Sequence, residues 1–195
     1  DDDIKNEINS DNDNQTDMEY LKYTMKWINI PQVFEYFYTK KFNDLNSMFI
    51  IGIPNDVRPV IWKKLTSVSD MSDVELNEYE TLIESSMNSK IKKAIDKDIP
   101  RTYAQSGGNT VVDRNSLKNV LYALSIKCPE IGYTQGMNYI AGFLLTIFND
   151  KTAFWVFYNI INPDGKYGFY ELFCDNLPLL HEWYYIFTVL LLKYE

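Results

Sequence analysis

The chain has 195 residues, of which 46% are hydrophobic and 15% aromatic, enough for one domain with a sizeable core, and this excludes wholesale disorder. The formal net charge is −8, and the first 20 residues alone hold eight acidic residues against one lysine. The remainder is nearly neutral, which argues against a nucleic-acid-binding protein, because such proteins depend on clustered Lys and Arg.

Residues 1–16 are rich in Asp and Asn and contain almost nothing to bury, so we expect an acidic disordered tail. The spacing of Asp11 and Asp13 resembles the start of a calcium loop, but Thr16 replaces the required glycine and Lys22 replaces the bidentate glutamate. A solvated tail is therefore the favoured interpretation. Residues 17–49 are expected to form an N-terminal helical extension, with a helix over about 31–49.

Helix signals follow one another through the middle of the chain. Gly52 and Pro54 separate the helix over 31–49 from one expected over about 56–66. Ser72 and Glu75 form a capping-box pattern that opens an amphipathic helix continuing to residue 87. Pro100 ends the helix before it, because the residue preceding a proline is disfavoured in the α region.

The last third of the chain continues the helical spacing. Apolar residues recur at 117, 120, 121 and 124, and again from Met137 to Phe148, where apolar residues on both sides predict a helix buried all round. A final apolar helix runs to Glu195 without a cap or a partner, so we expect the chain to be the N-terminal part of a larger helical domain. Sustained period-two alternation is absent, and the predicted fold class is all-α.

Several chemistries are disfavoured by the residues present. One histidine, His181, and two distant cysteines cannot assemble the usual His/Cys zinc site, and no P-loop motif occurs. No apolar run reaches the 18 residues that suggest a membrane span, and no signal segment opens the chain. Two cysteines favour a reducing compartment, although a single bridge remains compatible with the sequence. We therefore expect a cytoplasmic protein without a self-contained active site.

Three groups of polar residues stand where the hydrophobic pattern breaks. Arg101 follows a helix-ending proline, and Asp98 can hold its guanidinium by charge-assisted hydrogen bonds. Gln135 lies between a turn and the opening of an apolar helix, two residues after Tyr133. Arg58 shares a helix face with Trp62 at i, i+4. Taken singly, each group also has a structural explanation, as an ion pair, a cap or a cation stacked on a core indole.

In combination and in this order, the groups resemble the TBC domain, the helical GTPase-activating domain that acts on Rab GTPases. The resemblance covers about residues 50–195 and rests on three blocks: Gly52-Ile53-Pro54 with Arg58 and Trp62, Ile95-x-x-Asp98-Ile99-Pro100-Arg101, and Tyr133-x-Gln135-Gly136-Met137-Asn138. It implies an irregular multi-helix TBC-type fold, here its N-terminal subdomain and the start of the C-terminal part.

The resemblance also implies a function. Arg101 matches the family's arginine finger and Gln135 its glutamine finger, with Asp98, Arg58 and Tyr133 in supporting roles. The protein would be an activator rather than an enzyme: it would accelerate hydrolysis of GTP on a GTP-bound Rab partner in vesicle trafficking. It would need no cofactor of its own, since GTP and Mg²⁺ belong to the partner, and no nucleic acid. The expected location is the cytoplasm, with no direct membrane insertion and room for peripheral recruitment to endomembranes.

Other interpretations remain open at this point. The chain could be a TBC-like scaffold that binds Rab without stimulating hydrolysis, although both fingers are present. It could also be a helical interaction module whose acidic tail binds a basic partner. The lysines of the segment before Pro100 fit a surface that faces phosphate and equally fit a solvated helix face; they are Lys90, Lys92, Lys93 and Lys97.

Overall fold

A computed structural model describes residues 19–20, 22–23, 50–86, 88–102, 112–165 and 167–194. The chain divides into two compact units, with the boundary between Leu65 and Thr66, and each is described by itself. The expected acidic tail over 1–16 and the helix expected over 31–49 lie outside the described residues.

The first unit contains α4 (Arg58–Leu65), which confirms the helix expected after Pro54. Pro59 lies in its first turn, where a missing backbone N–H costs no helical hydrogen bond. Val57 and Ile61 are buried here, and partly buried apolar side chains from Tyr23 and Trp62, among others, pack against them. The Tyr23 hydroxyl donates to the Gly52 carbonyl over 2.8 Å, which ties the Gly52 turn to the preceding segment.

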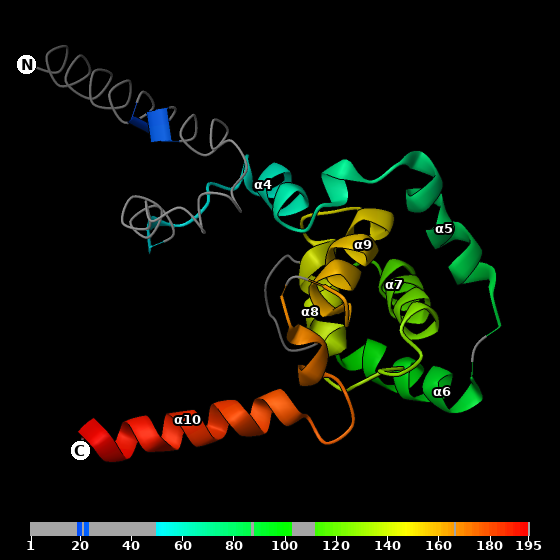
Figure 1. Ribbon diagram of the computed structural model, residues 1–195. Coiled ribbons are helices and arrows are strands. Elements are labelled where there is room, and N and C mark those ends of the chain that lie inside the picture. Colours follow the sequence, from blue (N-terminus) through cyan, green and yellow to red (C-terminus); the bar gives the residue numbers. More distant parts are fainter. Residues whose placement is uncertain are drawn as a thin grey trace, which may run out of the picture. The chain divides into compact units, whose positions relative to one another are not determined.

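The regular elements of the second unit are all helices within the described residues (Figure 1). In chain order they are η1 (Val68–Asp70), α5 (Asp73–Glu84), α6 (Ser89–Asp98), η2 (Ile99–Arg101), α7 (Arg114–Lys127), α8 (Met137–Leu145), α9 (Asp150–Ile161), η3 (Phe169–Leu172) and α10 (Pro178–Tyr194). Every regular element in the described part of the chain is helical, as the apolar spacing predicts.

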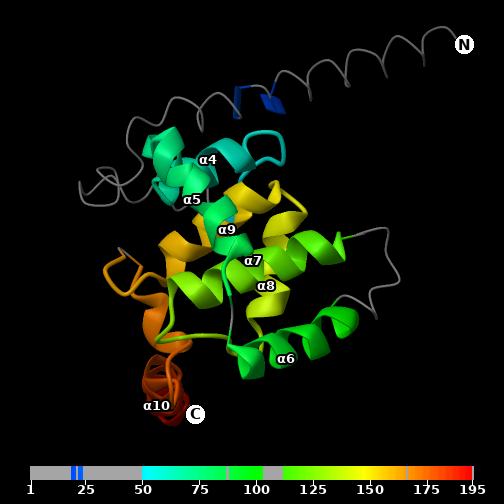
Figure 2. The same ribbon diagram turned by 90° about the vertical axis from the view of Figure 1, so that its right-hand side faces the viewer.

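The core of this unit lies between α7 and α9, with α5, α6 and α8 packed around them (Figures 1 and 2). Five consecutive residues of α9, from Ala153 to Phe157, are buried. Such continuous burial means that α9 has neighbours on all sides. The inward stripe of α7 includes Leu117, Val120, Leu121 and Leu124, the four apolar positions at helical spacing.

Local caps explain where these helices begin. The predicted capping box is present: the Ser72 hydroxyl accepts from the Glu75 backbone N–H over 3.3 Å, and Glu75 Oε2 accepts from the Ser72 N–H over 2.8 Å. Asp113 and Asn149 cap α7 and α9 in the same manner, each accepting from a backbone N–H three residues later. The first four backbone N–H groups of a helix have no acceptor within the helix, so a side chain that accepts from one of them stabilises the helix.

The helix expected from Met137 to Phe148 differs from the prediction. It ends at Leu145, and the Thr146 hydroxyl donates to the Phe143 carbonyl over 2.7 Å in the turn that follows. It is also not buried all round, since Tyr139 and Phe143 are each 47% exposed. Apolar residues on both faces are therefore not sufficient for complete burial, because the neighbouring helices cover only one side of α8.

The final helix, α10, lies apart from α7 and α9: its length is seen in Figure 1, and Figure 2 views it nearly end on. It packs against η3, where the Phe169 and Trp183 rings meet edge to face with centroids 6.3 Å apart. None of its residues is buried, although most are apolar. The expectation that further residues of a larger helical domain cover the apolar surface of α10 stays a prediction. Among the described residues, no helix combines the length and apolarity that crossing a membrane requires.

Candidate functional site

The end of α6 positions Arg101. Pro100 cannot continue an α-helix ladder, so the chain tightens into η2 directly after Asp98. Arg101 is the last residue of this turn, and its Nη2 lies 2.5 Å from Asp98 Oδ1. The arginine side chain is 48% exposed, whereas that of Asp98 is only 6% exposed. The expected ion pair is thus present, with a buried carboxylate holding an accessible guanidinium.

Tyr133 connects the same carboxylate to a second segment. Its hydroxyl donates to Asp98 Oδ2 over 2.7 Å, across 35 positions of sequence. Burial of the ring raises the pKa of Tyr133 above its ordinary value, and the hydrogen bond to Asp98 and its negative charge raise it further. The hydroxyl therefore stays protonated and acts as a donor. Asp98 uses one oxygen for Arg101 and the other for Tyr133.

Asn138 forms a second connection between the two segments. Its Nδ2 donates to Thr102 Oγ1 over 2.8 Å, and its Oδ1 accepts from the Gly136 backbone N–H over 3.1 Å. The Thr102 hydroxyl in turn donates to the Asp98 carbonyl over 2.9 Å. Only 1% of Asn138 is exposed, so these hydrogen bonds are made away from water.

Gln135 sits on the turn that this network holds. Thr134, just before it, donates from Oγ1 to the Phe173 carbonyl over 2.8 Å. Gly136, just after it, is the N-cap of α8 and has a φ of 109°, a conformation that L side chains rarely adopt. The Gln135 side chain is exposed and makes no hydrogen bond within the described residues. The Gln135 carboxamide is therefore accessible, and the turn that carries it is held by Thr134 on one side and Gly136 on the other.

We call the residues Asp98, Arg101, Thr102, Tyr133 and Asn138 the loop-bridging network. The sequence predicts a site role for three of its members, Asp98, Arg101 and Tyr133; Asn138 stands in the third block without a role, and Thr102 was missed. Asn138 could have been noticed because it is a polar residue next to Met137 in the first turn of an apolar helix. Nothing in the spacing indicates Thr102 as its partner. The network brings the segments carrying Arg101 and Gln135 together and leaves both side chains accessible.

Arg58 lies in the first unit. Its Nη2 donates to the Ile53 carbonyl over 2.8 Å and so braces the turn that contains Gly52 and Pro54. The supporting role expected for Arg58 in the site stays a prediction.

The remaining candidates are separate from this site. The four lysines of α6 are all exposed, and His181 is exposed on α10. Cys128 and Cys174 are both free thiols. No group of three or more His, Cys, Asp or Glu side chains suited to a metal ion occurs within the residues that the structure describes.

Comparison with known proteins identifies relatives of this chain. The family model described as "Rab-GTPase-TBC domain" matches residues 55–195. GTPase-activating protein GYP5 from Eremothecium gossypii is 33% identical over 141 residues, which cover 72% of this chain and 16% of that protein. Growth hormone-regulated TBC protein 1-A from Danio rerio is 31% identical over 111 residues, covering 54% of this chain and 31% of that protein. The chain therefore spans less than a third of the length of these relatives.

A solved structure has the same fold. The Chlamydomonas flagellar RabGAP TBC domain superposes with a TM-score of 0.57 at 21% identity, over 78% of this chain and 51% of that one.

Proposed function

The chain belongs to the Rab-GTPase-TBC domain family, and from that premise we propose that it is a GTPase-activating protein for a GTP-bound Rab-family GTPase. In this proposal the side chains of Arg101 and Gln135 insert into the partner's active site. The observation that carries it is the loop-bridging network, which ties the Arg101 loop to the Gln135 turn while both side chains remain exposed.

The chemistry of these two side chains suits GTP hydrolysis. In the transition state, negative charge develops on the oxygens around the transferring γ-phosphoryl group. A guanidinium inserted there presents two planar donors and neutralises part of that charge. A carboxamide can donate to one group and accept from another, so Gln135 can orient the attacking water. GTP and Mg²⁺ belong to the partner, and the activator contributes position and charge without a cofactor of its own.

Asp98 has a supporting role in this mechanism. A free arginine side chain has many rotamers, and ordering them costs free energy when the partner binds. The ion pair to Asp98 already restricts Arg101, so less of that cost remains. Tyr133 does the same for Asp98 by occupying its second oxygen. In a cell, such an activity would place the protein in the cytoplasm, recruited peripherally to membranes that carry its Rab.

The test is single-turnover GTP hydrolysis by a panel of Rab proteins, with and without this protein. Arg101→Ala should lower the stimulated rate by roughly 10³–10⁵, the usual contribution of an arginine finger. Gln135→Ala should lower it by about 10² or more, comparable to the loss of one transition-state donor. Arg114→Ala serves as a matched control, because Arg114 is an exposed arginine in the first turn of α7 and should leave the rate unchanged.

Two results would contradict the proposal. Stimulation that survives both Arg101→Ala and Gln135→Ala would show that other groups perform the catalysis. Binding of a GTP-loaded Rab without faster hydrolysis would instead identify a Rab-binding scaffold.

A further inference from the structure

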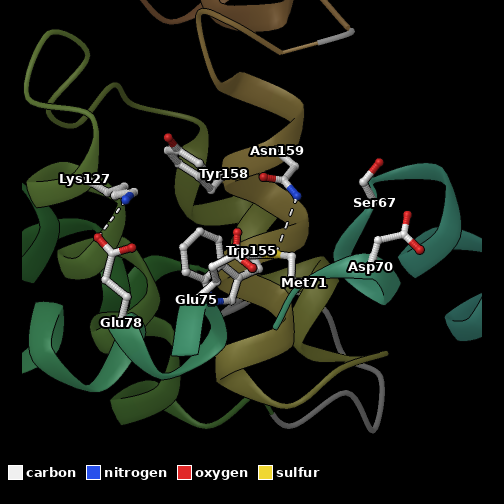
Figure 3. A pocket seen from close by; sticks show the side chains of 9 residues that line it. All are labelled: Ser67, Asp70, Met71, Glu75, Glu78, Lys127, Trp155, Tyr158 and Asn159. Carbon is white, nitrogen blue, oxygen red and sulfur yellow. Dashed lines mark hydrogen bonds and ion pairs between the residues drawn. The ribbon is translucent and has the colours of Figure 1, made fainter. Parts of the chain in front are cut away.

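A cavity of about 410 Å³ opens in the second unit between η1, α5, the end of α7 and α9 (Figure 3). We call it the α5–α9 cavity. Its volume lies within the range typical of ligand-binding sites. None of its lining residues belongs to the loop-bridging network, so the inference drawn from it is independent of the proposed function.

One wall of the cavity already holds a cation. Lys127 Nζ lies 5.6 Å from the Trp155 ring centroid and 5.4 Å from that of Tyr158. These rings are nearly perpendicular, at 87°, and form an aromatic corner. Lys127 also pairs with Glu78 over 2.6 Å. The corner shows that the walls stabilise positive charge, and the Lys127–Glu78 pair is neutral overall.

The opposite part of the cavity carries negative charge that the described residues do not neutralise. Asp70 lies across the cavity from Glu78, and Glu75 lies between them in front of Trp155 (Figure 3). Within the described residues, Asp70 makes no ion pair. Glu75 uses Oε2 for Ser72, over 2.7 Å to Oγ and 2.8 Å to the backbone N–H. Hydrogen bonds from the Ser72 hydroxyl and then its backbone lower the pKa of Glu75, so its charge persists at neutral pH.

The other polar groups of the cavity also favour a hydrogen-bond donor. Asn159 uses Nδ2 to donate to the Thr66 carbonyl over 2.6 Å, which leaves Oδ1 as an acceptor. The Trp155 N–H is already donated to the Leu76 carbonyl over 3.2 Å. A ligand that enters here therefore meets two carboxylates, an amide oxygen and apolar surface from Met71 and Tyr158, which are both partly exposed.

We propose that the α5–α9 cavity binds the arginine side chain of a basic segment of a partner protein, with Asp70 and Glu75 as its carboxylate partners. Guanidinium suits this site better than ammonium for two reasons. Its planar fork donates to more than one carboxylate and amide oxygen at once, and its weakly hydrated face packs on aromatic rings. The carbon stem of arginine matches the apolar surface beside the acids.

The test uses a short capped peptide with one arginine among glycines and serines, titrated into the protein by NMR. A twin peptide carries citrulline, which keeps the shape and removes the charge, and a third carries trimethyllysine. The reporter is the indole N–H signal of Trp155, assigned with Trp155→Phe, while the signals of Trp62 and Trp183 serve as references. We expect the arginine peptide to shift the Trp155 signal and the citrulline peptide to leave it in place.

Variants locate the site. Asp70→Asn with Glu75→Gln should weaken binding of the arginine peptide by roughly fivefold or more, as expected for losing two partly exposed ion pairs. Glutamine can still complete a capping box, so α5 should fold, and Asp70→Asn alone tests the site without touching that cap. Glu84→Gln is the matched control, because Glu84 is an exposed acid at the other end of α5.

Several results of this titration would contradict binding of an arginine side chain at Asp70 and Glu75. Equal binding of the citrulline peptide, tighter binding of the trimethyllysine peptide, or an affinity unchanged by Asp70→Asn with Glu75→Gln would each overturn the proposal. Shifts confined to the reference indoles would also overturn it. Because the readout needs neither GTP nor a GTPase, a negative result here says nothing against the GTPase-activating function.

Discussion

Asp98 is the residue through which the two loops of the candidate site meet. Its side chain is almost buried, and a buried carboxylate is costly unless it is paired and hydrogen-bonded. Arg101 and Tyr133 meet these two needs, one at each oxygen. Removing either partner therefore affects stability and the position of the other loop together.

Tyr133→Phe tests this connection, because it removes the hydroxyl that donates to Asp98 over 2.7 Å and that also lies 3.3 Å from Asn138 Oδ1. We expect a loss of about 1–2 kcal/mol in the free energy of unfolding, since the buried Asp98 carboxylate loses one of its hydrogen-bond donors. The stimulated rate of GTP hydrolysis should also fall, with Arg101 less well held. Denaturant unfolding and single-turnover hydrolysis measure the two quantities.

Tyr122→Phe is the control for that variant. The Tyr122 hydroxyl donates to Asp96 over 2.7 Å, the same type of bond at the same length, but Asp96 is half exposed and also pairs with Lys118 over 2.8 Å. This variant should cost some stability and leave the stimulated rate unchanged. An equal fall in rate for both tyrosine variants would mean that activity follows stability alone.

Gly136 supplies the conformation that presents Gln135. A Cβ added there would meet no atom within 4 Å, so Gly136→Ala introduces backbone strain at φ 109° without a steric clash. We expect lower stability and a lower stimulated rate, because the turn must relax and move Gln135. Gly168→Ala is matched to it, with φ 64° and equally open space at the start of η3. Gly168→Ala should lose stability and keep the stimulated rate. A stimulated rate that falls for Gly168→Ala but not for Gly136→Ala would contradict this role of Gly136.

The sequence predicts the residues of the site better than their connections. Asp98 and Arg101 are three positions apart and Tyr133 and Gln135 two, so local spacing suggests each pair. The bonds from Tyr133 to Asp98 and from Asn138 to Thr102 join positions 35 and 36 apart. Such bonds depend on how α6, α7 and α8 pack, and periodicity within one helix contains no information about that packing.

At the scale of elements, the start of α5 should respond to pH. Hydrogen bonds from Ser72 lower the pKa of Glu75 in the folded chain. A carboxyl whose folded pKa is lowered contributes stability above its unfolded pKa, and loses that contribution as pH falls through the folded value. Ser72→Ala should therefore lower the melting temperature at pH 7 more than at pH 3. Thermal melts at both pH values check this, and an equal loss at the two would contradict a role for the Glu75 charge.

The helices themselves show why sequence patterns succeed unevenly. The capping box of α5 and the stripe of α7 are local signals, and both are confirmed. The apolar spacing that predicts the other helices does not indicate α9, although α9 lies at the centre of the core. The apolar residues of α9 run without a break from Ala153 to Phe157, so no polar position outlines a stripe within that stretch. Its cap at Asn149 was the available signal.

Within the described residues of the second unit, most buried apolar side chains gather around α7 and α9, whereas α10 carries a run of exposed ones. Phe157 and Phe187 represent the two sets, one fully buried and the other 58% exposed. Burial, rather than hydrophobicity, determines what each contributes to stability.

Phe157→Ala should lower the free energy of unfolding by about 3–5 kcal/mol, because it opens a cavity in a closely packed core. Phe187→Ala removes the same atoms from a side chain that already faces solvent, so we expect a change within about 0.5 kcal/mol. Exposed apolar patches also promote association, and Phe187→Ala should therefore reduce any concentration-dependent self-association of the chain. Denaturant unfolding together with sedimentation velocity at several concentrations measures both effects. A large loss of stability for Phe187→Ala would mean that Phe187 itself is buried in solution, because only a buried phenylalanine can contribute that much.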